Sequence, residues 1–258
     1  MESKSELGGV ELTVENGVGT VTFSHPAGNS LPGKLLKDLA EAIANAGEDS
    51  RIRVIVLKSG GERAFCAGAS FDELMSIADP EVGKRFFMGF ANVINAMRKA
   101  PKFVVARVQG KTVGGGVGLA AAADYCLATT YASVKLSELA IGIGPFVVGP
   151  AVERKIGVSA MSQLAIDATE WRTAGWARDR GLFADVFDDI PKLDAAVAKL
   201  TQKLAQSNPE AMKLLKRTFW KGTEDWDTLL EERAAMSGTL VLGEFTRTAI
   251  EQFRSARA

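Results

Sequence analysis

The first part of the chain shows clear patterns of apolar and polar positions. Val10–Glu15 and Val18–Ser24 alternate apolar with polar residues on either side of Asn16-Gly17, which predicts a β-hairpin. In Leu35–Ala46 the apolar residues recur at the spacing of one helix face. Ile52–Lys58 is a run rich in β-branched residues and is typical of a buried strand.

The middle of the chain continues this alternation of strand and helix. Asp79 followed by Pro80 is a helix-start signal, and we expect a helix over Pro80–Lys99. Further strands are expected at Phe103–Val108, Tyr125–Ala128 and Ala132–Leu136. Strands that alternate with helices favour an α/β fold with crossover connections.

The last part of the chain shows only helical periodicity. Four helices are expected there, at Lys192–Gln206, Pro209–Lys221, Asp225–Leu242 and Glu244–Arg257. This change of pattern predicts an α/β core over residues 1–190 and a C-terminal helical domain over residues 191–258.

The amino-acid composition excludes several classes of function but does not identify one. The 258 residues include 31 Lys and Arg against 31 Asp and Glu, and 47% are hydrophobic. These values exclude an intrinsically disordered chain, and the neutral balance gives no electrostatic footprint for nucleic acid. His25 is the only histidine, and Cys66 and Cys126 lack zinc-ligand spacing, so we expect no metal site. Two lone cysteines, no signal peptide and no apolar run of about 20 residues predict a cytoplasmic protein that does not contact a membrane.

Two glycine-rich loops follow strands and lead into helices. The first is Ala64–Ser70 (AFCAGAS), before a helix at Phe71–Ser76, and the second is Val113–Gly118 (VGGGVG), before a helix from Leu119. Helix starts leave backbone N–H groups unpaired, so two that face each other can hold the oxyanion of a thioester. The simpler alternative is that these glycines serve tight turns and close packing. The second loop has neither the ending of a P-loop nor the third glycine of a Rossmann turn.

One carboxylate lies in an apolar segment, KLSELAIGIG. Glu138 is the only acidic residue between Asp124 and Glu153, and Leu136 and Leu139 are close to it in sequence. Apolar surroundings disfavour a charged carboxylate, so we expect a raised pKa suited to a general base. The residues leave open a Glu138 that points to solvent at the end of a strand.

Four segments, in order along the chain, resemble the motifs of one family. FSHPAGNSL resembles LNRPxxxNAL, AFCAGASFDEL resembles AFxAGADxxEM, VQGKTVGGGVGLAAAADYCLA resembles VxGxxxGGGxELxxxCDxxxA, and KLSELAIGIGP resembles FxxPExxxGxxP. These are motifs of the crotonase family, the enoyl-CoA hydratases and isomerases. Several ordered motifs are more specific than any one glycine loop, so the chain is identified as a member of that family.

This resemblance implies a fold, a substrate and a set of site residues. The fold is α/β, a spiral of ββα turns with a C-terminal helical oligomerisation domain, assembled as trimers or dimers of trimers. The substrate is an acyl-CoA thioester, with coenzyme A as part of the substrate and no separate cofactor. By the family's motifs, the N–H groups of Ala69 and Gly115 form the oxyanion hole and Glu138 is the catalytic acid/base. The substrate-binding positions implied are Ala67, Gly68, Ser70, Phe71, Gly114 and Gly118. Four basic residues of the helical tail are candidates for contact with CoA phosphates, but for each of them a solvent-exposed side chain without such a contact is the default expectation. They are Lys213, Lys216, Arg217 and Arg254.

Departures from the motifs leave the reaction open. Family hydratases have a first glutamate in GGGxEL, where this chain has Gly118. Addition of water is served by two carboxylates, whereas one suits an isomerase that converts a 3-enoyl into a 2-enoyl thioester. Phe146-Val147-Val148 replaces a glycine-rich stretch and suggests a more apolar acyl pocket. Hydratase and isomerase both remain open, as do a non-catalytic acyl-CoA-binding protein and another crotonase-type reaction such as thioester hydrolysis.

Overall fold

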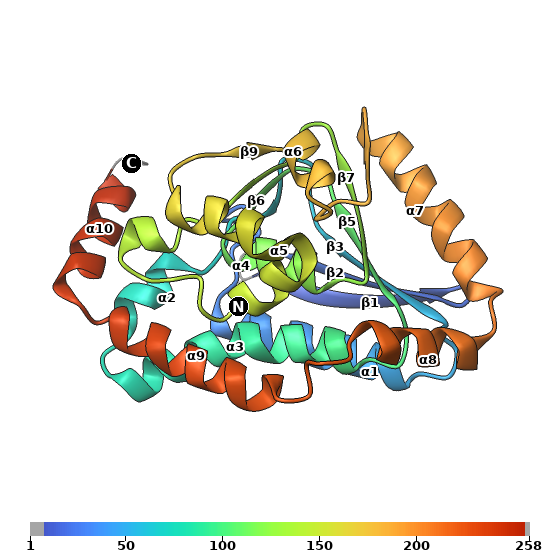
Figure 1. Ribbon diagram of the computed structural model, residues 1–258, viewed down its shortest axis with the longest axis horizontal. Coiled ribbons are helices and arrows are strands. Elements are labelled where there is room, and N and C mark those ends of the chain that lie inside the picture. The colour runs from blue at the N-terminus through green and yellow to red at the C-terminus, as the bar shows by residue number, and fades with distance from the viewer. Residues whose placement is uncertain (1–7, 256–258) are drawn as a thin grey trace, which may run out of the picture.

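Two sheets lie at the centre of the molecule and helices surround them (Figure 1). The computed structural model describes residues 8–255. The expectation that no signal peptide begins the chain concerns its first residues, and residues 1–7 lie outside the described part. No helix within residues 8–255 has the length and apolar character needed to cross a bilayer.

The larger sheet has the strand order β1-β2-β3-β5-β7-β10. β1 (Gly9–Glu15) and β2 (Val18–Ser24) form the predicted antiparallel hairpin, with Asn16 at φ 50° and Gly17 at φ 81° in its turn. Asn and Gly tolerate this left-handed backbone, and the turn fixes the register of the pair. The other neighbours pair in parallel, and they are β3 (Val54–Ser59), β5 (Val104–Val108), β7 (Tyr125–Thr129) and β10 (Asp185–Phe187).

The smaller sheet has the order β4-β6-β8-β9. Its strands are β4 (Ala64–Cys66), β6 (Lys111–Val113), β8 (Ser133–Lys135) and β9 (Arg172–Thr173). β4, β6 and β8 run parallel, and β9 is antiparallel to β8. Parallel strands bring their carboxyl ends to one edge of a sheet. The two glycine loops and the segment with Glu138 follow these three strands, so the fold brings them together at this edge.

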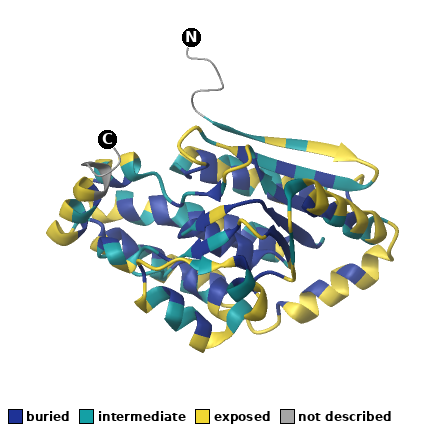
Figure 2. Ribbon diagram, turned by 90° about the horizontal axis from the view of Figure 1, so that it is seen from above, coloured by how far each residue is buried: buried dark blue, intermediate teal, exposed yellow. Residues whose placement is uncertain are grey.

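Helices cover both faces of the larger sheet, and the side chains of β3 are buried on both of these faces. Its residues Ile55 and Leu57 belong to the main core, whereas Val54 and Val56 pack in two smaller clusters on the opposite face. Burial on both faces explains the unbroken apolar run of this strand, and Figure 2 shows buried residues concentrated between the layers. The main core includes residues of α1 (Gly33–Glu48) and α3 (Pro80–Lys99), and the smaller clusters include residues of α7 (Ile190–Ala205) and α8 (Pro209–Phe219).

The helical tail packs directly onto the α/β core. α9 (Trp226–Leu240) lies along α3 (Figure 1), where a Cβ on Gly83 would be only 2.6 Å from the carbonyl oxygen of Gly238. Trp220, Trp226 and Leu230 belong to the same hydrophobic core as the sheet. The last element that the structure describes is α10 (Glu244–Ser255). The four helices of the tail are confirmed, and the division into domains 1–190 and 191–258 stays a prediction.

Two helices differ from the expected pattern. α4 (Gly115–Ala122) begins before Leu119 although glycine disfavours helix, because all its residues are buried and packing outweighs propensity. α5 (Gly149–Ile166) was not expected, and Gly157 at φ 76° interrupts its helical backbone. α2 (Phe71–Ser76) is as expected. Other elements that the pattern did not predict are η1 (Leu139–Ile141), α6 (Ala174–Asp179), β4, β6, β9 and β10.

Candidate active site

A pocket forms where the segments after β4, β6 and β8 meet. It holds about 560 Å³ of space, its opening to solvent included. The three segments contribute to its lining, among others, Ala67, Gly68, Ala69, Gly114, Gly115, Ser137 and Glu138. Four phenylalanines also line it, Phe71, Phe87, Phe90 and Phe146. The polar side chains on the lining are those of Ser137, Glu138 and Ser237.

The first glycine loop holds the amide of Ala69 in a fixed place. On one side Leu31 N–H donates to the Gly68 carbonyl (2.8 Å), and on the other Ser70 N–H donates to the Leu31 carbonyl (3.4 Å). Gly68 has φ 90°, and a Cβ on it would lie 3.3 Å from the carbonyl oxygen of Val113. Glycine is therefore required by both backbone angle and close approach. Within residues 8–255, no acceptor is found for the Ala69 N–H.

The second glycine loop presents the amide of Gly115 at the start of α4. Gly114 N–H donates to the Lys135 carbonyl (2.9 Å) and so ties this loop to β8. A Cβ on Gly115 would lie 2.7 Å from Cδ1 of Phe90, so a side chain would clash with the pocket wall. No protein acceptor in the described range takes the Gly115 N–H. A helix start also carries partial positive charge, which favours an anion at this amide.

Glu138 lies in the pocket wall next to the second glycine loop. Its Oε2 is buried and has no hydrogen-bond partner in the part of the chain that the structure describes. Burial raises the pKa of this carboxyl to about 7, although a backbone hydrogen bond opposes the shift. A Cβ on Gly114 would lie 3.1 Å from Oε1, so glycine leaves room for the carboxylate. The arrangement is not that of a solvent-facing glutamate, and it provides a group that can take and return a proton near neutral pH.

Gly118 has no free space beside it for a longer side chain. A Cβ built there would lie 2.6 Å from Cβ of Val148. Val148 itself lines the pocket. Val148 therefore occupies the space into which a side chain at position 118 would project.

The other sequence-predicted residues fall into two groups. Ala67, Gly68, Phe71 and Gly114 line the pocket together with the proposed catalytic positions. Ser70 and Gly118 do not lie on its lining, and the Ser70 hydroxyl instead caps α2 by accepting from Glu73 N–H (3.4 Å). Substrate contact by each of these residues stays a prediction.

Residues that the motifs did not single out complete the pocket. Ser137 lies at the position where the family motif has proline, and this departure from the motif could have been noticed in the sequence. Phe87, Phe90 and Ser237 lie on α3 and α9, and their helical spacing looked only like that of core residues. Burial raises the pKa of the Cys66 thiol to about 12, which fits a packing role and not a thiolate nucleophile.

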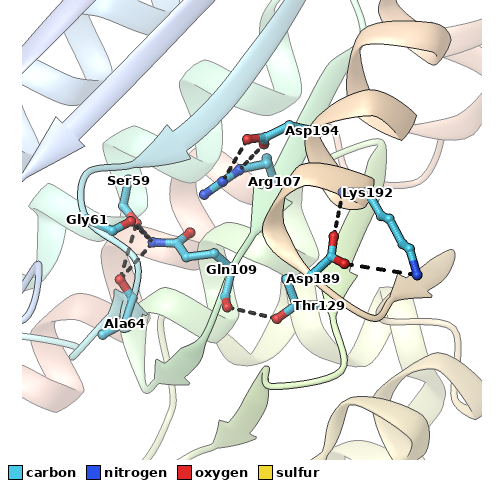
Figure 3. Close-up of polar contacts among 9 residues, drawn as sticks. All are labelled: Ser59, Gly61, Ala64, Arg107, Gln109, Thr129, Asp189, Lys192 and Asp194. Atoms are coloured by element: carbon cyan, nitrogen blue, oxygen red, sulfur yellow. Dashed lines mark hydrogen bonds and ion pairs between the residues drawn. The ribbon is translucent and has the colours of Figure 1, made fainter.

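A polar network next to the pocket supports the first glycine loop. Gln109 Nε2 donates to Ser59 Oγ (2.9 Å), to the Gly61 carbonyl (3.2 Å) and to the Ala64 carbonyl (3.0 Å). Thr129 Oγ1 donates to the Gln109 carbonyl (2.8 Å), which anchors the network to β7 (Figure 3). These contacts fix the turn that enters β4, and hence the start of the loop that carries Ala69.

One basic residue of the helical tail differs from what the sequence led us to expect. Lys216 is 2% exposed, and its ammonium pairs with Asp124 (2.9 Å) and donates to the Met97 carbonyl (2.7 Å). Both the interpretation of Lys216 as a phosphate ligand and the default of a solvated face are therefore wrong for this residue, because its side chain is buried in the core. The side chain of Arg254 lies outside the described residues. No group of His, Cys, Asp and Glu residues in the described range could hold a metal ion.

Comparison with known proteins gives consistent matches over most of the chain. The family model for enoyl-CoA hydratase/isomerase matches residues 13–249. The short-chain-enoyl-CoA hydratase of Clostridium acetobutylicum is 29% identical over 98% of this chain and 97% of its own length. The human mitochondrial methylglutaconyl-CoA hydratase is 30% identical over 87% of this chain and 67% of its own. An enoyl-CoA hydratase structure from Bacillus halodurans matches with a TM-score of 0.86 at 21% identity, covering 94% of this chain and 99% of that one, which shows the fold.

Proposed function

The chain belongs to the enoyl-CoA hydratase/isomerase family, and on that premise we propose that it shifts the double bond of an enoyl-CoA thioester with one carboxylate. Membership confirms the resemblance to the crotonase family, and the structural matches confirm the α/β spiral fold. In the proposed reaction Glu138 is the single acid/base. The N–H groups of Ala69 and Gly115 form the oxyanion hole.

The proposed reaction is a balanced proton transfer within one substrate. The Glu138 carboxylate removes a proton from C2 of a 3-enoyl thioester. The C2–H electron pair forms a double bond between C1 and C2, and the π pair of the carbonyl moves onto the thioester oxygen. Two backbone N–H groups, from Ala69 and Gly115, stabilise the negative charge of this dienolate. Protonated Glu138 then returns a proton to C4, and the product is the 2-enoyl thioester. A carboxyl with a pKa of about 7 suits both halves of the reaction, because a matched pKa lets it accept and release a proton.

The observation that carries the choice of isomerase is the contact between Gly118 and Val148. A second carboxylate at position 118 would need the space that the Val148 side chain fills. Glu138 is the only Asp or Glu on the pocket lining within residues 8–255. This supports one-base chemistry over addition of water.

Hydration is the second candidate, and two observations favour it. The relatives described above are named hydratases. Ser137 also lines the pocket directly before Glu138, and its hydroxyl can orient a water molecule that Glu138 deprotonates. In this version one carboxylate and one hydroxyl share the task of two carboxylates.

Mass spectrometry in heavy water tests the proposal. Hex-3-enoyl-CoA and hex-2-enoyl-CoA are incubated separately with the protein, and with Glu138→Gln to correct for uncatalysed exchange. The proposal predicts conversion of the 3-enoyl substrate with deuterium incorporation and no added D₂O mass. Addition of D₂O to the 2-enoyl substrate would establish hydration instead. Release of free CoA would indicate thioester hydrolysis, and unchanged thioesters would indicate an acyl-CoA-binding protein; either result contradicts the proposal.

A further inference from the structure

Ser237 is a buried hydroxyl on an otherwise apolar part of the pocket wall. It lies on α9, is 1% exposed and lines the pocket. No hydrogen bond of this hydroxyl is found within residues 8–255, not even the common one to a carbonyl of the preceding turn. The neighbouring Thr239 does make that bond, to the Ala235 carbonyl (3.1 Å). A hydroxyl that lines a ligand pocket and makes no hydrogen bond to the protein is available to a ligand, so it points to a ligand that can exchange a hydrogen bond with it.

Ser237 lies away from the proposed reacting atoms. Phe90 of α3 contacts the Gly115 position, which belongs to the proposed oxyanion hole. The residue after Ser237, Gly238, packs against Gly83 near the other end of α3. Phe90 and Gly83 are separated by roughly 10 Å at a helix rise of 1.5 Å per residue. Ser237 therefore lies away from the proposed oxyanion hole along α3, and in the proposed function this is the side on which we place the distal part of the acyl chain.

The pocket wall also limits the chemistry of that distal part. Among the described lining residues there is no Lys, Arg or His. A carboxylate at the end of the acyl chain would thus be buried without a cation, which is strongly unfavourable. A neutral hydroxyl or keto oxygen can instead exchange a hydrogen bond with Ser237, because a serine hydroxyl both donates and accepts.

From these observations we infer that Ser237 selects acyl-CoA substrates with a neutral oxygen substituent on the distal acyl chain. This inference rests on the proposed function for the placement of the thioester. Phe87 and Phe146 supply the apolar walls along the chain, and the hydroxyl of Ser237 supplies the selective contact. Ser237 is a specificity-determining residue in this account, and it takes no part in proton transfer.

Matched pairs of substrates test the inference. Hex-3-enoyl-CoA and oct-3-enoyl-CoA are compared with their terminally hydroxylated and keto-substituted counterparts, and kcat/KM is measured for each. Wild type should prefer an oxygenated member of a pair by about tenfold, the typical effect of one neutral hydrogen bond. Ser237→Ala should lose this preference and turn over the plain substrates faster, since their chains no longer meet an unsatisfied hydroxyl. Thr239→Ala, an exposed control on the same helix, should keep the wild-type preference.

A binding measurement separates this inference from the proposed reaction. The saturated counterparts, hexanoyl- and octanoyl-CoA with and without the oxygen, do not react and are titrated by calorimetry. If no double-bond shift occurs but the oxygenated thioesters bind about tenfold more tightly in a Ser237-dependent way, the proposed reaction fails and the inference stands. Equal affinity within every pair, or a preference that survives in Ser237→Ala, would overturn the inference.

Discussion

Two buried carboxylates in this protein, Asp124 and Glu138, differ in how completely the surrounding protein groups bind them. Asp124, at the start of β7, is satisfied on every side by Val104 N–H (2.8 Å), Trp220 Nε1–H (2.7 Å) and Lys216 (2.9 Å). Glu138, in the pocket wall, has a buried Oε2 without a partner among residues 8–255. The first group joins the α/β core to the helical tail, and the second faces an open pocket.

The difference between these two regions indicates that a buried carboxylate can stabilise the fold or take part in a reaction, depending on its partners. A carboxylate with a full set of partners has no capacity left for a substrate, but its removal disrupts the groups around it. A carboxylate that is buried with one oxygen unpartnered is held at a pKa of about 7 and is available for proton transfer. We therefore expect substitutions at Asp124 and Lys216 to affect folding, and substitutions at Glu138 to affect catalysis.

Glu138→Gln gives the largest expected effect. Removal of a general acid/base should lower kcat by about 10²- to 10⁴-fold. The Kd for a saturated acyl-CoA should change less than about twofold, because the amide has the same shape as the carboxyl. Steady-state kinetics and calorimetry measure the two quantities, with the exposed Glu153→Gln as the matched control. Wild-type turnover by Glu138→Gln would remove Glu138 from the mechanism.

Lys216→Met should mainly reduce stability. It leaves Asp124 buried without its cation, and breaking such a pair costs about 3–5 kcal/mol. Urea unfolding measures the loss, while kcat per folded molecule should stay at the wild-type value. The double variant Asp124→Asn/Lys216→Met should recover part of the loss, since neither charge remains. A single variant as stable as wild type would mean that the pair does not hold core and tail together.

The fold and parts of the site were predictable from the sequence, whereas contacts between residues distant in the chain were not. The alternation of strands and helices predicted the hairpin, α3 and the helical tail at nearly their observed bounds. The apolar run around Glu138 indicated a raised pKa for its carboxyl but left a solvent-facing side chain open, and in the structure burial raises that pKa to about 7. The sequence did not indicate that Lys216 is buried, because its partner Asp124 is distant in the chain and only the tertiary fold brings them together.

Other parts of the site depend on packing that no local pattern encodes. α4 begins at Gly115 because burial of the whole helix outweighs the low helix propensity of its glycines. The sequence showed that Gly118 replaces a glutamate, but only the structure showed that Val148 fills the adjoining space. Ser237 gave no signal at all, since a serine in an amphipathic helix is ordinary until its surroundings are known.

The stability of Glu138→Gln should rise with pH relative to wild type. The folded-state pKa of Glu138 is raised to about 7 from 4.5, so the folded protein holds this proton more tightly than the unfolded chain. The stabilisation is fully present below pH 4.5 and is lost as pH rises through about 7. Glutamine does not titrate, so the variant should gain about 2–3 kcal/mol over wild type between pH 4.5 and pH 8. Urea unfolding at both pH values checks this, and a constant difference would contradict the raised pKa.

Gly118→Ala should produce the smallest effect, a loss of about 1–3 kcal/mol from overpacking against Val148. The double variant Gly118→Ala/Val148→Ala should be more stable than the sum of the single variants predicts, because the smaller side chain relieves the contact. Unfolding midpoints of the four proteins give this coupling. Strict additivity would show that the two positions do not compete for the same space.

Carbon NMR of the side-chain carboxyls gives the most direct test of the central contrast. Protein labelled with ¹³C in its glutamate carboxyls is titrated without substrate, and the Glu138 signal is assigned by its absence in Glu138→Gln. We expect a midpoint at about pH 7 for Glu138. The Glu153→Gln control should leave that signal unchanged. A midpoint near 4.5, the ordinary value for glutamate, would contradict the claim that the pocket holds a carboxyl ready for proton transfer.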